Sequence, residues 1–266
     1  MPHSPNKPLP QDRCGATLRA TDARAPRRRA PDLLDPVVAY DRLAPTYDEI
    51  ARRRAAYLEG VDRLIAAEVA PGSRSLLDVG AGTGERSRRL AAAAGLAEVT
   101  LLEPSSAMRR GYPPTVAVWP IRAEELRKRE GGFDVVTCLW NVLGHVFPEA
   151  ARVEVLRDFA RLRAPGGRIF VDVNHRYNAR HYGALRTALR WFRDRVAPGV
   201  ANGDVRVCWK LGDGSCVTSG HVFTHREFVR LAAGAGLRIE RRWVVDYATG
   251  RVCRRAWQGN LLYRLG

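Results

Sequence analysis

A glycine-rich turn carries the clearest chemistry in this sequence. Residues 76–85 read Leu-Leu-Asp-Val-Gly-Ala-Gly-Thr-Gly-Glu, an apolar run that leads into a helical pattern. Glycines let the backbone turn sharply and approach a ligand closely, and the first N–H groups of the following helix are free to bind it. In a doubly wound sheet the ligand crevice lies at such a strand-to-helix turn. The segment therefore predicts a site for a nucleotide-type cofactor.

The spacing of the glycines separates two classes of cofactor. Dinucleotide sites carry the pattern G-x-G-x-x-G. This chain has Gly80, Gly82 and Gly84, and Glu85 stands where the last glycine of the dinucleotide pattern would be. An acidic side chain beside a pyrophosphate is unfavourable, whereas S-adenosylmethionine has no phosphate and carries a positive sulfonium. The spacing therefore favours S-adenosylmethionine.

A carboxylate at the end of the next apolar run supports this interpretation. Glu103 follows Leu102 and precedes Pro104. A carboxylate at this place can accept hydrogen bonds from both ribose hydroxyls, as it does in dinucleotide folds. The alternative is an acidic residue that is simply solvated at a strand end, and the nearby glycine turn favours the ribose role.

Two further strand ends supply candidate residues for an acceptor pocket. The run at 133–139 is followed by Trp140, Asn141 and His145. The run at 168–173 is followed by a dense polar and aromatic cluster: Asn174, His175, Arg176, Tyr177, Arg180, His181 and Tyr182. Histidines titrate near neutrality and arginines bind carboxylates or phosphates. We therefore take the three histidines as candidate catalytic bases and the other residues as candidate acceptor contacts, while a core or capping histidine and a solvated helix start remain the alternatives.

Composition limits the classes of function. The five cysteines, Cys14, Cys138, Cys208, Cys216 and Cys253, have no metal-binding spacing. We expect reduced thiols, no metal and a cytoplasmic protein, because no run is apolar or long enough for a membrane span or a signal peptide. The formal net charge of +16 comes from arginines spread over the whole chain. The excess of arginine over lysine is typical of a high-GC genome, and the arginines are spread rather than clustered, so the charge does not favour nucleic-acid binding.

The surrounding pattern predicts the elements that position these residues. Residues 1–34 are predicted to be a disordered tail, and one helical pattern over 39–70 forms a lid at 35–72. Strands at 75–79, 99–102, 116–121, 133–139 and 168–173 alternate with helices at 85–94 and 149–163, which indicates a parallel sheet. A helix at 179–195, a hairpin of 205–211 with 216–223, a helix that begins at Thr224 and strands at 237–245 and 259–265 follow.

The glycine turn, Glu103 and the alternation of strands and helices resemble those of the class I S-adenosylmethionine-dependent methyltransferases of the small-molecule branch. Matching blocks at 77–84, 102–108, 123–126, 133–139 and 162–172 cover most of residues 75–175, and residues 40–48 resemble the family's lid. The resemblance implies a doubly wound, Rossmann-like α/β sheet of seven strands in the order 3-2-1-4-5-7-6, with the last strand antiparallel. It also implies cofactor contacts by Tyr47, Asp78, Gly80, Ala81, Gly82, Gly84, Glu103, Pro104, Glu124 and Leu139. The family often has Gly-Asp where this chain has Ile121 and Arg122, so Glu124 is the candidate for the adenine amine.

The resemblance implies methyl transfer to an oxygen or nitrogen of a small molecule, such as a natural-product intermediate. Such a reaction needs mainly proximity and alignment, because sulfonium is a good leaving group. An RNA methyltransferase and a non-catalytic donor-binding protein are the alternatives. The Asx/Ser-Pro-Pro-aromatic motif of base-nitrogen enzymes is missing after residue 139, and Cys138 follows Thr137 rather than proline. In the domain at 35–266, the helix and hairpin at 178–223 are predicted to form the acceptor region, with a homodimer surface as the other interpretation.

Overall fold

The structure is a computed structural model that describes residues 33–211 and 214–266. The predicted tail therefore lies outside the described residues up to residue 32, and so do the hairpin-turn residues 212 and 213. Leu34 is described, and it pairs with the hairpin. Its N–H donates to the Val217 carbonyl at 2.9 Å, and its own carbonyl accepts from Thr218 Oγ1 at 2.7 Å.

Helices and strands alternate through most of the described chain. The α-helices are α1 (Pro36–Arg53), α2 (Ala55–Ala66), α3 (Glu85–Ala94), α4 (Glu149–Leu162), α5 (Ala179–Tyr182), α6 (Ala184–Val196) and α7 (His225–Gly234). The strands are β1 (Ser75–Val79), β2 (Glu98–Leu102), β3 (Ala117–Trp119), β4 (Phe133–Cys138), β5 (Arg163–Val173), β6 (Asp204–Leu211), β7 (Gly214–His221), β8 (Ile239–Val245), β9 (Val252–Cys253) and β10 (Asn260–Leu265). Short 3-10 helices lie at 108–111, 123–128, 142–145, 200–203 and 256–258.

The central sheet has one strand more than predicted. Within the described residues it has eight strands in the order β3-β2-β1-β4-β5-β10-β8-β9. Strands β1 to β5 are parallel, and β10 runs antiparallel to both β5 and β8. The hairpin strands β6 and β7 form a separate two-stranded sheet, so β8 and β10 are the sixth and seventh strands of the central sheet and the expected order 3-2-1-4-5-7-6 holds for these seven. The expected count of seven was wrong because the chain after β8 returns along that strand as β9.

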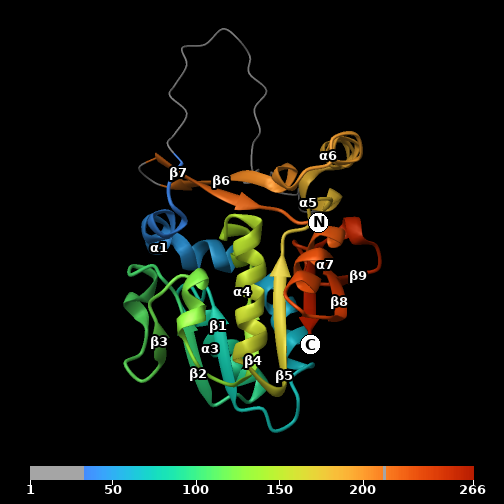
Figure 1. The fold of residues 1–266 in the computed structure, drawn as a ribbon. Helices are drawn as coiled ribbons and strands as arrows, with labels where there is room; N and C mark the ends of the chain where they lie inside the picture. Colours follow the sequence, from blue (N-terminus) through green and yellow to red (C-terminus); the bar gives the residue numbers. More distant parts are fainter. Residues whose placement is uncertain (1–32, 212–213) are drawn as a thin grey trace, which may run out of the picture.

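Two hydrophobic cores cover the two faces of the sheet. Alternate residues of a strand point to opposite faces, so Leu77 and Leu76 enter different cores. One core receives Phe159 of α4 and Phe228 of α7, and the other receives Val61 of α2. Figure 1 shows α4 lying across the sheet, with β5 beside it. The sheet is therefore held rigidly between helical layers, and the ends of its strands are fixed in position.

Two predicted single helices are each divided in two. The helical pattern over 39–70 breaks at Arg54 (φ −113°, ψ 12°), where α1 ends and α2 begins. The pattern over 179–195 breaks at Gly183, whose φ of 86° lies outside the helical region. Apolar periodicity continues across both breaks, so the pattern alone does not reveal them. The break at Arg54 lets α1 and α2 cover different parts of the strand ends.

The hairpin and α1 lie together at the end of the sheet toward which β5 points (Figure 1). Besides the pairing of Leu34, the thiol of Cys216 on β7 donates to the carbonyl of Ala39 on α1 at 3.7 Å. The parallel strands β1, β2, β4 and β5 all end at this side of the sheet. The lid helix and the hairpin therefore roof the carboxyl ends of the strands, where ligands bind in such folds.

Candidate active site

A cavity of about 520 Å³ lies between the strand ends and the lid helices. The sheet side contributes the glycine turn, Glu103, Pro104, Leu139 and the segment that follows β4. The lid side contributes residues of α1 and α2. The lining includes Tyr40, Tyr47, Asp48, Leu58, Glu59, Asp78, Gly80, Ala81, Gly82, Thr83, Arg86, Glu103, Pro104, Arg122, Glu124, Leu139, Trp140 and His145. Its size suits a nucleoside-sized ligand.

The glycine turn forms one wall of the cavity and requires glycine there. Gly80 and Gly82 have φ values of 76° and 57°, and a Cβ would collide with Val142 at the first position and with the Tyr47 ring at the second. The predicted cofactor contact at Gly84 is corrected. Gly84 caps the start of α3, it does not line the cavity, and a Cβ there would meet Leu101.

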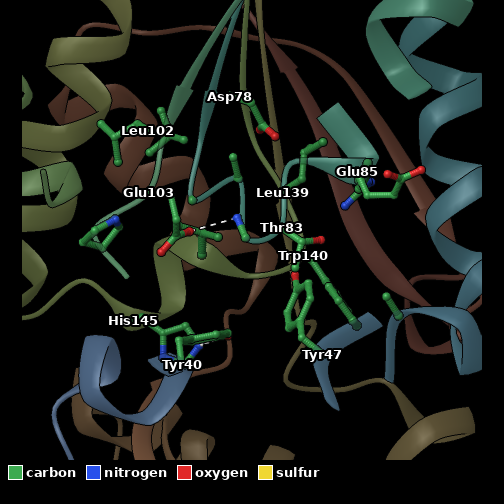
Figure 2. A pocket seen from close by; sticks show the side chains of 18 of the residues that line it. Tyr40, Tyr47, Asp78, Thr83, Glu85, Leu102, Glu103, Leu139, Trp140 and His145 are labelled. Carbon is green, nitrogen blue, oxygen red and sulfur yellow. Dashed lines mark hydrogen bonds between the residues drawn. The ribbon is translucent and has the colours of Figure 1, made fainter. Parts of the chain in front are cut away.

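Glu103 is held at the cavity wall by two backbone donors. Its Oε2 accepts the Gly82 N–H and its Oε1 accepts the Ser105 N–H, both at 2.9 Å. Figure 2 shows the first bond beside the cavity. Burial raises the pKa of this carboxyl to about 7, although the two donors favour its ionised form. Each carboxylate oxygen keeps a lone pair for a ligand hydroxyl, as the ribose assignment needs.

An acidic cluster with one arginine lies at the other end of the turn. Asp78 is buried, accepts from the hydroxyls of Ser87 and Thr137, and has a pKa raised by burial. Arg86, which the sequence analysis missed, donates Nε to Asp62 of α2 at 2.7 Å. Its Nη2 is buried and has no hydrogen-bond partner within the described part of the chain. An open donor beside carboxylates suits a ligand that carries both a carboxylate and positive charge.

These features fit S-adenosylmethionine. The unpartnered Arg86 Nη2 can donate to the carboxylate of its methionine group, while Asp78 and Glu103 supply the negative field that an ammonium and a sulfonium require. Glu103 stands where ribose hydroxyls can donate to it. Glu124, the candidate for the adenine amine, also lines the cavity, and so does Arg122. The Arg122 guanidinium is paired with Asp35 at 2.7 Å.

A histidine and a tyrosine meet on the lid side of the cavity (Figure 2). His145 Nδ1 lies 2.9 Å from the Ser219 carbonyl, and its Nε2 lies 3.1 Å from the Tyr40 hydroxyl. A carbonyl only accepts, so Nδ1 carries the proton and the Tyr40 hydroxyl donates to the lone pair of Nε2. Burial lowers the pKa of His145, which keeps the ring neutral near pH 7. The sequence analysis predicted His145 but missed Tyr40, whose partner is 105 residues away.

Aromatic rings surround this pair. Tyr40 contacts the rings of Tyr47, His145 and Trp209 at centroid distances of 6.4, 5.4 and 5.5 Å. Tyr47 in turn contacts Trp140 at 5.8 Å. Trp209 belongs to β6, so the hairpin fixes the position of Tyr40 from behind. The aromatic faces are suited to a cationic group.

The turn after β4 has an unusual backbone conformation that places Trp140 in the cavity wall. Trp140 and Asn141 both have positive φ, 55° and 66°, which is rare for residues with a side chain. Asp172 accepts the Trp140 N–H at 3.0 Å, and the Asn141 amide bonds the His221 carbonyl and the Asn174 N–H. The prediction that Asn141 binds the acceptor is thus corrected, because its side-chain amide is occupied by hydrogen bonds to the backbone of His221 and Asn174. Trp140 lines the cavity, and its predicted contact with the acceptor stays a prediction.

The structure contradicts the assignment of His175 as a catalytic base. Its side chain is 3% exposed, its Nδ1 donates to the Ala256 carbonyl at 2.9 Å, and it lies outside the cavity lining. Burial lowers its pKa to about 4. His181 is also outside the lining, because its ring packs on Tyr247 and Tyr182, and burial lowers its pKa to about 4. Only His145 of the three candidate histidines faces the cavity.

The polar cluster after β5 is mainly structural. Arg176 is 4% exposed and ion-pairs with Glu227 at 2.7 Å and with Asp194 at 3.1 Å. Tyr177 donates to the same Asp194. The predicted acceptor contacts at Arg176, Tyr177, Asn174 and Tyr182 are therefore corrected, because none of them lines this cavity. Arg180 also lies outside it, in the lining of a second cavity, so its acceptor role stays a prediction. Asn174 accepts from Asn260, Tyr182 packs under Arg190, and Arg180 pairs with Asp246.

The described residues also limit metal binding and membrane crossing. No group of three or more histidine, cysteine, aspartate or glutamate side chains within 33–211 and 214–266 is arranged to hold a metal. No helix in the same ranges has both the length and the apolar character that a membrane crossing requires.

Comparisons with known proteins agree with this geometry. A curated relative, the dTDP-4-amino-2,3,4,6-tetradeoxy-D-glucose N,N-dimethyltransferase of Saccharopolyspora spinosa, is 33% identical over 137 residues, which are 51% of this chain. The chain matches only 48% of that relative's length. The CcbJ methyltransferase of Streptomyces caelestis has a similar fold, with a TM-score of 0.59, 20% identity and coverage of 85% of this chain and 96% of that one.

A second solved structure, the sugar N-methyltransferase KedS8 from a Streptoalloteichus species, has a TM-score of 0.54 at 21% identity and covers 92% of this chain and 98% of its own. The family model described as a methyltransferase domain matches residues 47–241, which begin within α1 and include α2, the glycine turn, Glu103 and the hairpin. The chain therefore belongs to the methyltransferase domain family.

Proposed function

We propose that this methyltransferase transfers a methyl group to an amine nitrogen of a small molecule, such as an amino sugar in natural-product biosynthesis. The Tyr40–His145 pair beside the donor cavity carries the proposal. An aliphatic amine is largely protonated at neutral pH and must lose a proton before it can attack. The name of the Saccharopolyspora relative, an amino-sugar N,N-dimethyltransferase, supports the same acceptor class.

The mechanism needs alignment and one proton acceptor. Bound S-adenosylmethionine supplies an electrophilic methyl group on a good leaving group. Glu103 would hold the ribose, and Arg86 would hold the carboxylate. Tyr40 takes up the acceptor's proton as its own proton passes to Nε2 of His145, whose Nδ1–H stays on the Ser219 carbonyl. The site would then hold the free amine facing the methyl group that the bound donor would supply.

The aromatic surround fits a nitrogen acceptor. An amine that has gained a methyl group is a cation, and so is the protonated amine that first enters. Tyr40, Tyr47 and Trp140 present ring faces and edges around the cavity mouth. Such rings attract a cation by about 0.5–2 kcal/mol each, and more when water is excluded. They offer no comparable gain to a neutral alcohol.

The insert at 178–223 contributes to the acceptor region through one ring. None of its described residues lines the donor cavity, but Trp209 packs against Tyr40. We infer that the insert orients the Tyr40–His145 pair and closes the acceptor side. The expectations of a homodimer and of a cytoplasmic location stay predictions.

The first experiment is calorimetric titration with S-adenosylmethionine. Wild-type protein should bind the donor, and E103A should lose about tenfold or more in affinity because the ribose contact is removed. E98A, which changes an exposed glutamate at the start of β2, the strand that precedes Glu103, is the matched control and should bind like the wild type. No binding to the wild type, or equal binding by all three proteins, would reject the donor-site assignment.

The second experiment tests the proton acceptor with a panel of small amines and alcohols. H145Q and Y40F should each lower kcat by about a hundredfold on amines at neutral pH while they leave donor affinity unchanged. Raising the pH should rescue both variants, because the amine then loses its proton to solvent. A preference for alcohols, or a loss of activity that pH does not rescue, would contradict the amine mechanism.

A further inference from the structure

Helix α6 turns its apolar side away from the protein. Leu185, Leu189, Phe192 and Val196 are 77%, 61%, 62% and 67% exposed within the described part of the chain. They follow one another at spacings of four, three and four residues, so at about 100° per residue they fall within about 60° of the helix circumference. These four residues are called the α6 stripe below. Figure 1 shows α6 at the outer edge of the molecule, beside α5.

The opposite side of α6 is polar and faces the protein. It carries Thr187 and Arg190, which are buried, and Asp194. Asp194 accepts from the Tyr177 hydroxyl at 2.6 Å and pairs with Arg176 at 3.1 Å. Arg190 donates to the Arg176 carbonyl at 3.3 Å. These contacts fix the rotation of α6 about its axis, because a rolled helix would leave buried polar groups unpaired.

This orientation is the reverse of the usual one. A helix on the surface of a globular domain normally turns its apolar stripe toward the core and its polar residues toward water. In α6 the polar side takes the place of the apolar one, and the polar contacts hold it there. A contiguous apolar patch exposed in this way marks an interaction surface.

The narrow width of the α6 stripe favours a helix as its partner. An apolar face that enters a core is about 100° wide or more, and a helix that lies in a membrane surface also needs a broad apolar face. Spacings of three and four residues are those of the seam at which two helices pack side by side. Trp191 is also exposed, but it lies beyond the flanking Arg195, whose guanidinium stands over its ring.

The residues that flank the α6 stripe are arginines. Arg186 and Arg193 lie on one side of it and Arg195 lies on the other. The one acidic residue of α6, Asp194, is on the inner side. In packed pairs of helices the flanking positions form ion pairs across the seam and thereby select the partner. The flanks of α6 therefore complement a helix whose own flanks are acidic.

The same charge disfavours the two occupants that this chain could supply. A second copy would bring the arginines of its own α6 against these arginines, and like charges across an interface are unfavourable. The segment 1–32 carries seven lysine and arginine residues against three aspartates, so it is basic as well.

We propose that the α6 stripe binds an amphipathic helix of a partner protein, one whose apolar seam is flanked by acidic residues. Such a helix would lay its seam along the stripe, as amphipathic helices do in apolar grooves. Its carboxylates would meet the arginines on both sides. The proposal does not depend on the acceptor class or on the proton transfer proposed above.

The test uses the full chain and a fluorescein-labelled synthetic peptide of three heptads, with leucine at the seam positions and glutamate at the flanking positions. Fluorescence anisotropy should show binding to the wild type, and the same peptide with lysine in place of glutamate should bind at least about tenfold more weakly. L189Q/F192Q removes the centre of the stripe and should weaken the binding of the glutamate peptide by at least about tenfold. V229Q, which removes an exposed valine from α7, is the matched control and should bind like the wild type.

A charge exchange tests the flanks. R193E/R195E should lose affinity for the glutamate peptide and gain affinity for the lysine peptide. Circular dichroism should show wild-type helix content in every variant, since the substituted side chains are exposed.

Three outcomes would overturn the proposal. One is that the wild type binds neither peptide, or binds both with equal affinity. Another is that the wild type forms dimers in sedimentation velocity and L189Q/F192Q does not, which would assign the α6 stripe to a second copy. The third is that phosphatidylglycerol vesicles bind the wild type and not L189Q/F192Q, which would assign the stripe to a membrane surface.

Discussion

The carboxyl group of Glu103 connects proton binding to donor binding. Its pKa of about 7 lies above the usual glutamate value of 4.5 because burial disfavours the charged form. Between these two pH values the folded protein without donor holds a proton that the unfolded chain has lost. The free energy of unfolding should therefore fall as pH rises through this window. Donor affinity should rise over the same window, because ribose hydroxyls donate to the ionised carboxylate.

Calorimetry in buffers of different ionisation enthalpy measures this coupling. Wild-type protein should release a proton when it binds S-adenosylmethionine near pH 6, and less than one near pH 8. The isosteric variant E103Q should release none at either pH, and its unfolding free energy should lose the corresponding slope. Proton release that persists in E103Q would assign the titration to another group, such as Asp78.

Arg86 is predicted to recognise the amino-acid end of the donor. R86M removes the unpartnered Nη2 donor and should weaken the binding of S-adenosylhomocysteine by about tenfold or more. The binding of 5′-methylthioadenosine, which lacks the amino-acid group, should not change. R88M, on the exposed side of the same helix, is the control. Equal losses for both ligands would mean that Arg86 acts only by holding α2 through Asp62.

At the residue scale, sequence reasoning found residues that line the cavity where the signal is local. Gly80 and Gly82 precede a helix, and Glu103 ends a strand, so each is recognisable from its immediate neighbours. His175 and Arg176 are the opposite case. Their types suggested chemistry, but Arg176 is neutralised by Glu227 and Asp194, which are 51 and 18 residues away. Nothing near Arg176 in the sequence reveals that pairing.

At the scale of elements, Arg176 joins the end of β5 to α6 and α7. It contacts Asp194 on α6 and Glu227 on α7, and its Nε donates to the Val222 carbonyl after β7. Loss of one member leaves buried carboxylates unpaired, so R176M should lower the unfolding free energy by about 3–5 kcal/mol in urea denaturation. Donor affinity of the folded variant should be unchanged. A stable variant with lost acceptor binding would restore the original assignment of Arg176.

The element boundaries show what apolar patterns can and cannot predict. Runs such as 75–79 and 133–139 were found because buried parallel strands are continuously apolar. The breaks at Arg54 and Gly183 were missed because periodicity continues through them. Strand β9 was missed because two residues carry no periodicity, and its pairing with Val244 and Val245 depends on the preceding turn.

At the scale of the whole molecule, alternation of strands and helices was enough to predict a parallel sheet with the site at its carboxyl edge. Alternation does not determine what covers that edge. The position of the hairpin depends on long-range contacts of Trp209 with Tyr40 and of Asn141 with the His221 carbonyl. The carboxyl edge of the sheet was therefore predictable from local motifs. The arrangement of α1 and the hairpin over that edge could be known only from the folded structure.

The pairing of Leu34 with β7 has a consequence for how the protein opens. Leu34 exchanges hydrogen bonds with Val217 and Thr218, and Cys216 reaches the Ala39 carbonyl, so the beginning of α1 and the hairpin share bonds. Segments that share bonds unfold together. The amides of β7 and of the first turns of α1 should exchange with deuterium at one common rate, distinct from that of α2. The rate at which a ligand enters under α1 would then be limited by the joint local unfolding of β7 and the first turns of α1. Movement of α1 alone would not open the site.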